Sequence, residues 1–173
     1  MKKLKCCYGI SSRCDTHEHI FMIDYDGITL EEVKKHLKFV QEDYKLSDIY
    51  IMSSTHGFNA ICLDKLPLSI IYNIGISVFS PACRDFFKYG FKREYYVLRF
   101  DNDKDLVCIL PGNGIRDKST PHKEFLEMFF NFKIKGENFD ENKILTVIQY
   151  PSKKNGYHII EKMEHYVYDK RQI

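Results

Sequence analysis

The chain has 173 residues, of which 44% are hydrophobic, so a packed single domain is expected and a disordered chain is excluded. Its 26 basic and 24 acidic side chains leave a net charge of +2, which excludes a globally basic surface and requires any phosphate site to be a local groove. No apolar run approaches the roughly 20 residues of a membrane span, no signal-type apolar region follows the basic start, and six cysteines lack regular pairing. We therefore expect a cytoplasmic protein with no membrane partner.

Two strands and a helix are predicted near the start of the chain. Residues 7–10 and 19–23 flank a turn at 13–16 and predict a hairpin whose second strand is apolar enough to be buried. Thr29 and Glu32 then match a capping box, and apolar residues follow at alternating steps of three and four. This spacing predicts a helix that ends near Tyr44.

The middle of the chain predicts two further hairpins around a second helix. The first hairpin joins residues 48–52 to 58–63, and the second joins 94–100 to 106–110. Pro67 suits the first turn of the helix between them. The order strand, helix, strand, strand, helix, strand is typical of an α+β fold with a split β-α-β antiparallel sheet, like an RNA-recognition motif, and helices on one face.

The last third predicts one more helix and one more hairpin. The helix begins at Thr120-Pro121 and has an aromatic face, and the hairpin joins residues 143–150 to 157–163. No linker or low-complexity segment interrupts the chain. We therefore predict a single domain over residues 1–173, with a core at about 19–110 and a C-terminal extension at 111–173.

Paired acids close the strand predicted at residues 19–23. Asp24 and Asp26 are separated by one residue, so their side chains lie on the same side of an extended chain. Two carboxylates on one side repel each other unless a cation lies between them, and hard divalent ions take oxygen ligands. The pair predicts a site for Mg²⁺ or Mn²⁺, and a solvated strand end with a turn at Asp26-Gly27 is the alternative.

Two further polar groups stand at predicted turns. The first combines small hydroxyl residues with an imidazole, which can donate hydrogen bonds to a phosphate. The second group, at the end of a later strand, contains two carboxylates and two cations. An ordinary hairpin turn is the alternative for the first group, and a solvated turn is the alternative for the second. In chain order the residues of the two groups are Ser53, Ser54, His56, Arg99, Asp101, Asp103 and Lys104.

The order of these motifs resembles the archaeo-eukaryotic primase superfamily, which includes the primase-polymerases of plasmids, viruses and mobile elements. The resemblance covers roughly residues 19–104. It implies a palm-like domain in which Asp24, Asp26 and Asp101 bind metal ions and serve as the catalytic residues. It also implies a nucleotide-binding group formed by Ser53, Ser54, His56, Asn59, Arg99 and Lys104.

The chain departs from the family pattern at two motifs. Asn59 stands where the family carries a histidine after the Gly57-Phe58 pair, although Ser54-Thr55-His56 matches a shorter form of the motif. Asparagine can donate a hydrogen bond to phosphate but brings no charge. In a second alignment of the third motif, Ser80-Pro81 occupies the acidic position and Arg99 contacts phosphate, which would leave one metal ligand missing.

The function implied by the resemblance is a metal-dependent nucleotidyltransferase that synthesises or extends primers in the replication of a mobile element. Its partners would be nucleoside triphosphates, a single-stranded DNA template or primer-template, and a separately encoded helicase or primase subunit. The chain has no phosphate loop of its own for an ATP-driven motor. A basic and aromatic groove would hold the template, and its predicted residues are Lys88, Lys92, Arg93 and Tyr95, in a cluster that also contains Tyr89, Phe91 and Tyr96. An ordinary strand entry is the alternative for this cluster.

Several alternatives stay open at this point. The chain could be a catalytically silent, RNA-recognition-motif-like binder of nucleic acid, or a metal-dependent replication nuclease that uses the same carboxylates. The pattern at residues 152–158 also resembles a Ser…Gly-x-His motif, which ordinary turn composition explains equally. A zinc site is a further alternative, with Cys6 or Cys7, Cys14, His17 and His19 as ligands.

Overall fold

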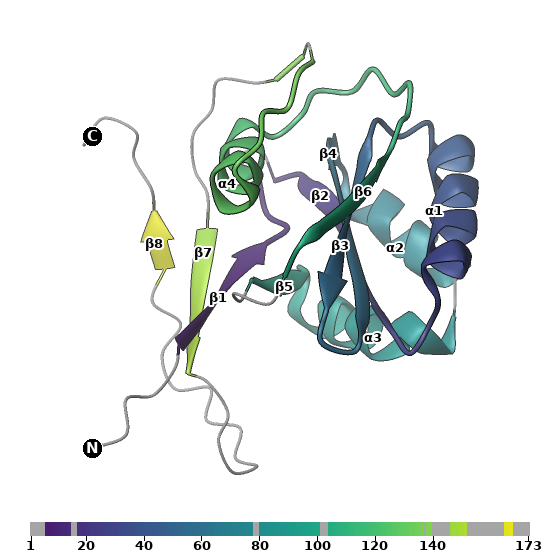
Figure 1. The fold of residues 1–173 in the computed structure, drawn as a ribbon, viewed down its shortest axis with the longest axis horizontal. Helices are drawn as coiled ribbons and strands as arrows, with labels where there is room; N and C mark the ends of the chain where they lie inside the picture. The colour runs from purple at the N-terminus through teal and green to yellow at the C-terminus, as the bar shows by residue number, and fades with distance from the viewer. Residues whose placement is uncertain are drawn as a thin grey trace.

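The computed structural model describes residues 6–14, 17–77, 80–100, 104–136, 138–139, 146–151 and 165–167. The α+β class predicted from the sequence is confirmed (Figure 1). None of the described helices is long and apolar enough to cross a membrane. In chain order the elements are β1 (Cys6–Ser11), β2 (His19–Asp26), α1 (Leu30–Tyr44), β3 (Ile49–Ser54), β4 (Gly57–Leu66), α2 (Leu68–Ser77), the 3₁₀ helix η1 (Pro81–Cys83), α3 (Arg84–Arg93), β5 (Val97–Phe100), β6 (Leu106–Leu110), α4 (Thr120–Phe130), β7 (Thr146–Pro151) and β8 (His165–Val167).

Four strands form a central sheet in the order β2-β4-β3-β6. All its pairings are antiparallel, and β4 lies between β2 and β3. Because both neighbours of β4 run against it, β2 and β3 run parallel to each other and are connected through α1. This is the predicted split β-α-β unit, and the predicted hairpin between β3 and β4 is confirmed.

A second sheet, which we call the side sheet, has the order β5-β1-β7-β8. The sequence predicted one sheet, a β1–β2 hairpin and a β5–β6 hairpin, and all three expectations are wrong. β1 pairs with β5 and β7, and β6 pairs with β3. Among the described residues, the two sides of the expected first hairpin meet at an isolated bridge between Arg13 and His19. Short turns suggest hairpins, but strands with two free edges can pair with distant segments that bury more surface.

The C-terminal strands belong to the side sheet. β7 pairs antiparallel with β1 on one edge and with β8 on the other. The later partner of β7 among the described residues is therefore His165–Val167, and the predicted hairpin between residues 143–150 and 157–163 is not tested. The segment 157–163, where the sequence placed that strand, lies outside the described residues, as does the motif at 152–158.

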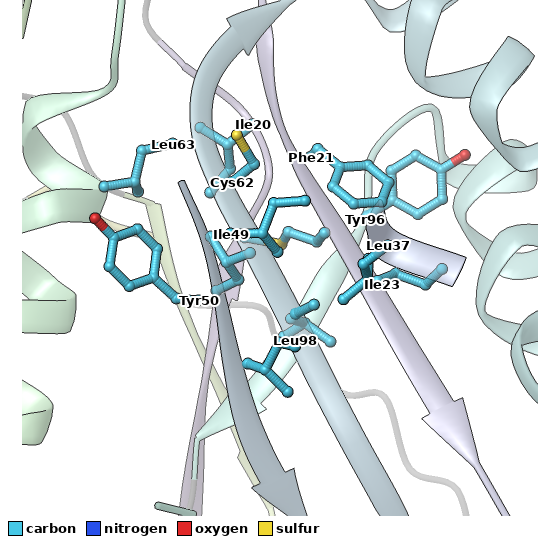
Figure 2. Packing of buried hydrophobic residues seen from close by; sticks show 14 of the residues in the cluster. Ile20, Phe21, Ile23, Leu37, Ile49, Tyr50, Cys62, Leu63, Tyr96 and Leu98 are labelled. Carbon is cyan, nitrogen blue, oxygen red and sulfur yellow. The ribbon is translucent and has the colours of Figure 1, made fainter. Parts of the chain in front are cut away.

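The two faces of the central sheet are both covered. Phe21 and Ile23 lie on the face beside Leu37 of α1, whereas Tyr50 and Leu63 point to the opposite side (Figure 2). In Figure 1, α1 and α2 lie on one side of the central strands, and α4 and the side sheet lie on the other. Phe100 of β5 links the side sheet to α4, since its ring packs edge-on against that of Phe125 with ring centroids 4.8 Å apart.

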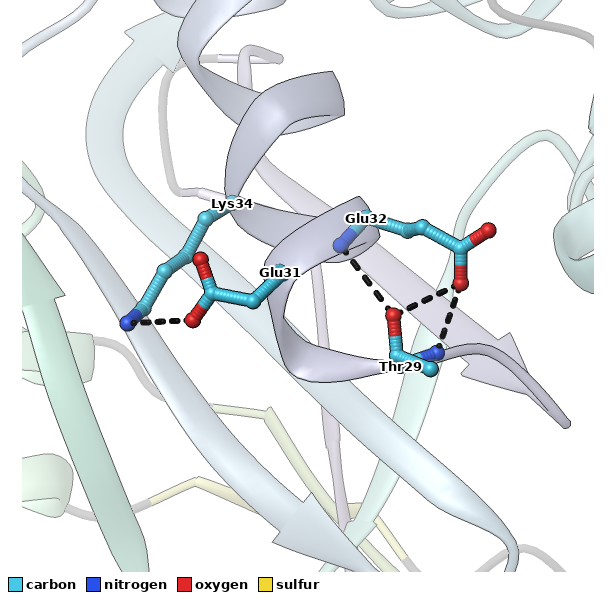
Figure 3. A network of polar contacts seen from close by, with 4 residues as sticks. All are labelled: Thr29, Glu31, Glu32 and Lys34. Carbon is cyan, nitrogen blue, oxygen red and sulfur yellow. Dashed lines mark hydrogen bonds and ion pairs between the residues drawn. The ribbon is translucent and has the colours of Figure 1, made fainter.

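The capping box predicted for α1 is present (Figure 3). Thr29 Oγ1 accepts a hydrogen bond from the Glu32 backbone N–H at 3.4 Å, and the Glu32 carboxylate accepts one from the Thr29 backbone N–H at 3.1 Å. These bonds satisfy two backbone donors that would otherwise lack partners at the helix start. The cap sets the point at which the chain leaves β2 and turns back along the sheet.

Helix α3 was not predicted from the sequence. Its signals were Asp85 in the first turn and Lys92 and Arg93 in the last, which complement the helix dipole. Phe87 and Gly90 form its buried side. Gly90 allows a close approach, because a Cβ there would lie 2.0 Å from the ring of Tyr96.

Candidate functional site

The paired acids stand at the end of β2, as predicted. Tyr25 between them is fully buried on the α1 side, where its hydroxyl hydrogen-bonds the ring of His36. Strand alternation therefore directs Asp24 and Asp26 to the opposite side. Asp24 is half-buried and Asp26 is exposed. The two carboxylates thus share one face at a strand end, which is the geometry the sequence predicted.

A chain of polar contacts runs from Asp24 across the sheet. Asn59 lies directly opposite Asp24 on β4, and its side-chain N–H donates to the Asp24 carboxylate. The Asn59 side-chain oxygen accepts a hydrogen bond from the Lys104 ammonium group. Asn59 and Lys104 are only 3% and 6% exposed, so both bonds are shielded from water. The amide consequently links an acidic side chain to a basic one and holds both in place.

A small cavity, which we call the basic cavity, opens beside this chain. Its volume is about 120 Å³, and both acids and Asn59 line it. The remaining polar lining comes from the β3–β4 turn, from β5 and from the segment before β6, and consists of Ser54, Thr55, His56, Arg99 and Lys104. The structure therefore brings together seven of the side chains that the sequence assigned to catalysis and nucleotide binding.

Two of the predicted site residues are placed differently. Ser53 does not line the basic cavity, because its hydroxyl accepts a hydrogen bond from the Asp105 backbone N–H at 2.8 Å and so ties β3 to the start of β6. Asp101, the predicted third acid, lies outside the described residues. In the alternative alignment, Ser80 takes its place, and here its hydroxyl caps η1 by accepting from the Ala82 N–H at 3.3 Å.

The pKa of the Asp24 carboxyl is raised above its ordinary value. Burial is the main cause, because a charged group loses hydration there, and repulsion from Asp26 is the second. Lys104, the hydrogen bond from Asn59 and the charge of Arg99 act in the opposite direction without cancelling these effects. The site thus holds two acids where a further positive charge would lower the free energy of the ionised form.

A larger cavity, which we call the aromatic cavity, lies on the other side of the same two acids. It has a volume of about 420 Å³ and is lined along η1, α3 and the start of β5. Of the predicted template-binding residues, Arg93 and Tyr95 line it, whereas Lys88 and Lys92 are exposed on α3 outside its lining. The guanidinium group of Arg13 covers the Tyr95 ring at 4.0 Å from its centroid.

Two residues of α3 that line the aromatic cavity, Asp85 and Phe86, were missed by the sequence analysis. Tyr89, which also lines it, belongs to the predicted template-binding cluster. No helix was predicted over this segment, so the directions of its side chains were not predicted. A helical spacing of apolar positions through Phe87 and Phe91 was the signal that could have located them.

The donor set at the strand end fits a hard divalent cation. Mg²⁺ is commonly held by one or two carboxylates, with waters and substrate phosphates completing its shell, and Asp24 and Asp26 supply such a pair. Among the residues that the structure describes, no three His, Cys, Asp or Glu side chains form a metal-holding group.

Within that part of the chain, the His19 ring contacts the Ser12 hydroxyl at 2.9 Å, while the side chains of Cys6 and Cys7 are not described. The zinc alternative stays a prediction.

No protein-family model, no curated protein and no solved structure matches this chain. The function is therefore argued from the two cavities and the acids between them.

Proposed function

We propose that this protein is a metal-dependent nucleotidyltransferase of the primase-polymerase kind, acting on nucleoside triphosphates and a single-stranded template. The observation that carries the proposal is the composition of the basic cavity. There, two adjacent carboxylates face cations and hydroxyl groups from three other segments of the chain. A triphosphate needs cationic and hydrogen-bonding groups along its oxygens and a metal ion at the reacting phosphorus.

Asp24 and Asp26 are the residues that would hold Mg²⁺ or Mn²⁺. When bound, the ion neutralises charge on the phosphates and favours loss of the acceptor hydroxyl proton. Asn59 fixes one oxygen of Asp24 through its hydrogen bond, and Asp24 lines the cavity. This support matters because a ligand that rotates freely would lose entropy each time it bound the ion.

The cationic residues of the basic cavity would bind the phosphates. Arg99 is exposed on β5, and a guanidinium group can donate two parallel hydrogen bonds to a phosphate. Ser54 and His56 lie at the β3–β4 turn, where they can donate to further phosphate oxygens. In the transfer, the acceptor oxygen bonds to the α-phosphorus, the bond from that phosphorus to the diphosphate breaks, and the hydroxyl proton passes to solvent.

The burial of both faces of the central sheet argues against a non-catalytic binder of nucleic acid. A binder of the RNA-recognition-motif type needs an open sheet with exposed aromatic side chains. On the face of the central sheet that carries Asp24, Met22 and Met52 are fully buried and Tyr50 is 4% exposed. Tyr50 is therefore not exposed there for stacking with bases. The nuclease alternative uses the same acids and is separated by experiment.

The test is incorporation of labelled nucleotides on a primed single-stranded DNA template with Mg²⁺ or Mn²⁺, and with EDTA as a control. The decisive variant is the double substitution Asp24→Asn with Asp26→Asn, which keeps the shape of both side chains and removes their charges. Glu42→Gln with Asp43→Asn is the matched control, because it makes the same charge change on the exposed side of α1. We expect metal-dependent incorporation that persists in the control and is lost in the site variant.

Three outcomes would contradict the proposal. Incorporation retained by the Asp24 and Asp26 variant would remove these acids from the chemistry. Metal-dependent cleavage of the template without incorporation would assign the same acids to a nuclease. Absence of both activities with either metal and with either ribonucleotides or deoxyribonucleotides would leave a silent relative as the better description.

A further inference from the structure

The two cavities meet at the same pair of acids. Asp24, Asp26 and Val97 line both of them, so ligands bound on the two sides would approach each other at the carboxylates. An enzyme that joins two substrates needs such an arrangement, because the reacting atoms must be held within a few ångströms of each other. The aromatic cavity is therefore placed to hold a second reactant.

The charges that line the two cavities differ. The basic cavity adds Arg99 and Lys104 to the two acids, whereas the aromatic cavity adds a third carboxylate, Asp85, and one cation, Arg93. Phosphate groups are repelled by three carboxylates, but sugar hydroxyls and base amino groups can donate hydrogen bonds to them. The aromatic cavity thus suits the uncharged part of a nucleotide, and the basic cavity suits the phosphates.

The walls of the aromatic cavity suit a planar ring. Tyr89 is 51% exposed, and the guanidinium carbon of Arg93 lies 5.8 Å from its ring centroid. Phe86 is held in place by stacking on Tyr96, with ring centroids 5.2 Å apart and an interplanar angle of 27°. Gly90 packs closely against the Tyr96 ring, which keeps that ring in position to stack on Phe86. Nucleobases stack on such aromatic platforms whatever their identity.

The volume of about 420 Å³ falls within the range of sites for small organic ligands. We propose that the aromatic cavity binds the base and sugar of the acceptor nucleotide, stacked against Tyr89, with a sugar hydroxyl directed to Asp24 and Asp26. The assignment of this ligand as the acceptor rests on the proposed function, whereas binding of a nucleoside does not. A free nucleotide and the end of a nucleic-acid strand present the same base and sugar.

The experiment measures binding of labelled adenosine by equilibrium dialysis, with inorganic tripolyphosphate as the probe of the basic cavity. Tyr89→Ala removes the stacking surface at an exposed position, and Phe39→Ala is the matched control because Phe39 is 59% exposed on α1, outside both cavities. Because Tyr89→Ala removes the ring on which the base stacks, we expect this variant to bind adenosine about 5- to 150-fold more weakly than the wild type. Binding of tripolyphosphate should be unchanged in both variants.

Adenosine binding that is absent at millimolar concentration, or equal in wild type and Tyr89→Ala, would overturn the proposal. Its failure differs from failure of the proposed function. Incorporation that is unaffected by Tyr89→Ala would remove the acceptor site and keep the nucleotidyltransferase, whereas Tyr89-dependent adenosine binding without incorporation would do the reverse. Comparing adenosine with a short primer strand in the same assay distinguishes a free nucleotide from a strand end as the source of the ligand.

Discussion

Replacement of Asn59 by leucine is the sharpest test of the polar chain that supports Asp24. Leucine has a similar size, so the substitution removes hydrogen bonds without opening a large cavity. Asn59 bonds to the carboxylate of Asp24 and to the ammonium group of Lys104, and each bond to a charged partner contributes about 1.5–3 kcal/mol. Two such bonds predict a loss of about 3–6 kcal/mol in the free energy of unfolding.

The assay is equilibrium unfolding in urea, followed by circular dichroism and by tyrosine fluorescence. Asn73→Leu is the matched control, because Asn73 is exposed on α2 and the substitution makes the same chemical change at the surface. For a chain of this length, a loss of 3 kcal/mol also predicts a fall of about 6–12 °C in the melting temperature. A loss below about 1 kcal/mol, or one no larger than in the control, would refute the claim that Asn59 holds the acid in place.

Two further predictions concern stability. Gly57→Ala would place a Cβ 2.0 Å from the backbone oxygen of Tyr25 and force the end of β2 to shift. We therefore expect the free energy of unfolding, measured by thermal unfolding, to fall by about 1–3 kcal/mol. Thr55→Ala in the same exposed turn is the control, and an equal effect of the two would contradict this reasoning. Burial lowers the pKa of His122 to about 4 from an unfolded value near 6.5, so only the unfolded chain binds the proton between these values. The contribution of His122 to the free energy of unfolding should therefore fall as the pH drops through this window, by up to about 1.4 kcal/mol per pH unit, and His122→Gln should lower the slope of the urea-unfolding profile by that amount. Burial also lowers the pKa of His19 to about 4, so the variant keeps the slope that His19 contributes.

Features that depend on neighbouring residues could be predicted well. The capping box of Thr29 and Glu32 and the spacing behind it identified α1, because helix starts are determined within one turn of the chain. The hairpin of β3 and β4 was equally visible. Asp24 and Asp26 could be placed on one side of β2 because side chains alternate along any strand.

Pairings between distant segments could not be predicted in this way. A short turn after β1 pointed to β2 as its partner, yet β1 pairs with β5 and β7, because a strand edge takes the partner that buries the most surface. The cavity lined by α3 was missed for a related reason. Its shape depends on how Phe86 packs against Tyr96, which no local pattern records.

By itself, the sequence determined the α+β class, the helices α1, α2 and α4 and the geometry of the paired acids, since each follows from backbone periodicity over a few residues. Only the tertiary structure decided that Asn59 and Lys104 reach Asp24, that Arg99 lines the same cavity, and that an aromatic cavity lies on the far side of the acids. These contacts join segments far apart in the chain, and their free energy depends on burial and charge that exist once the sheets have packed.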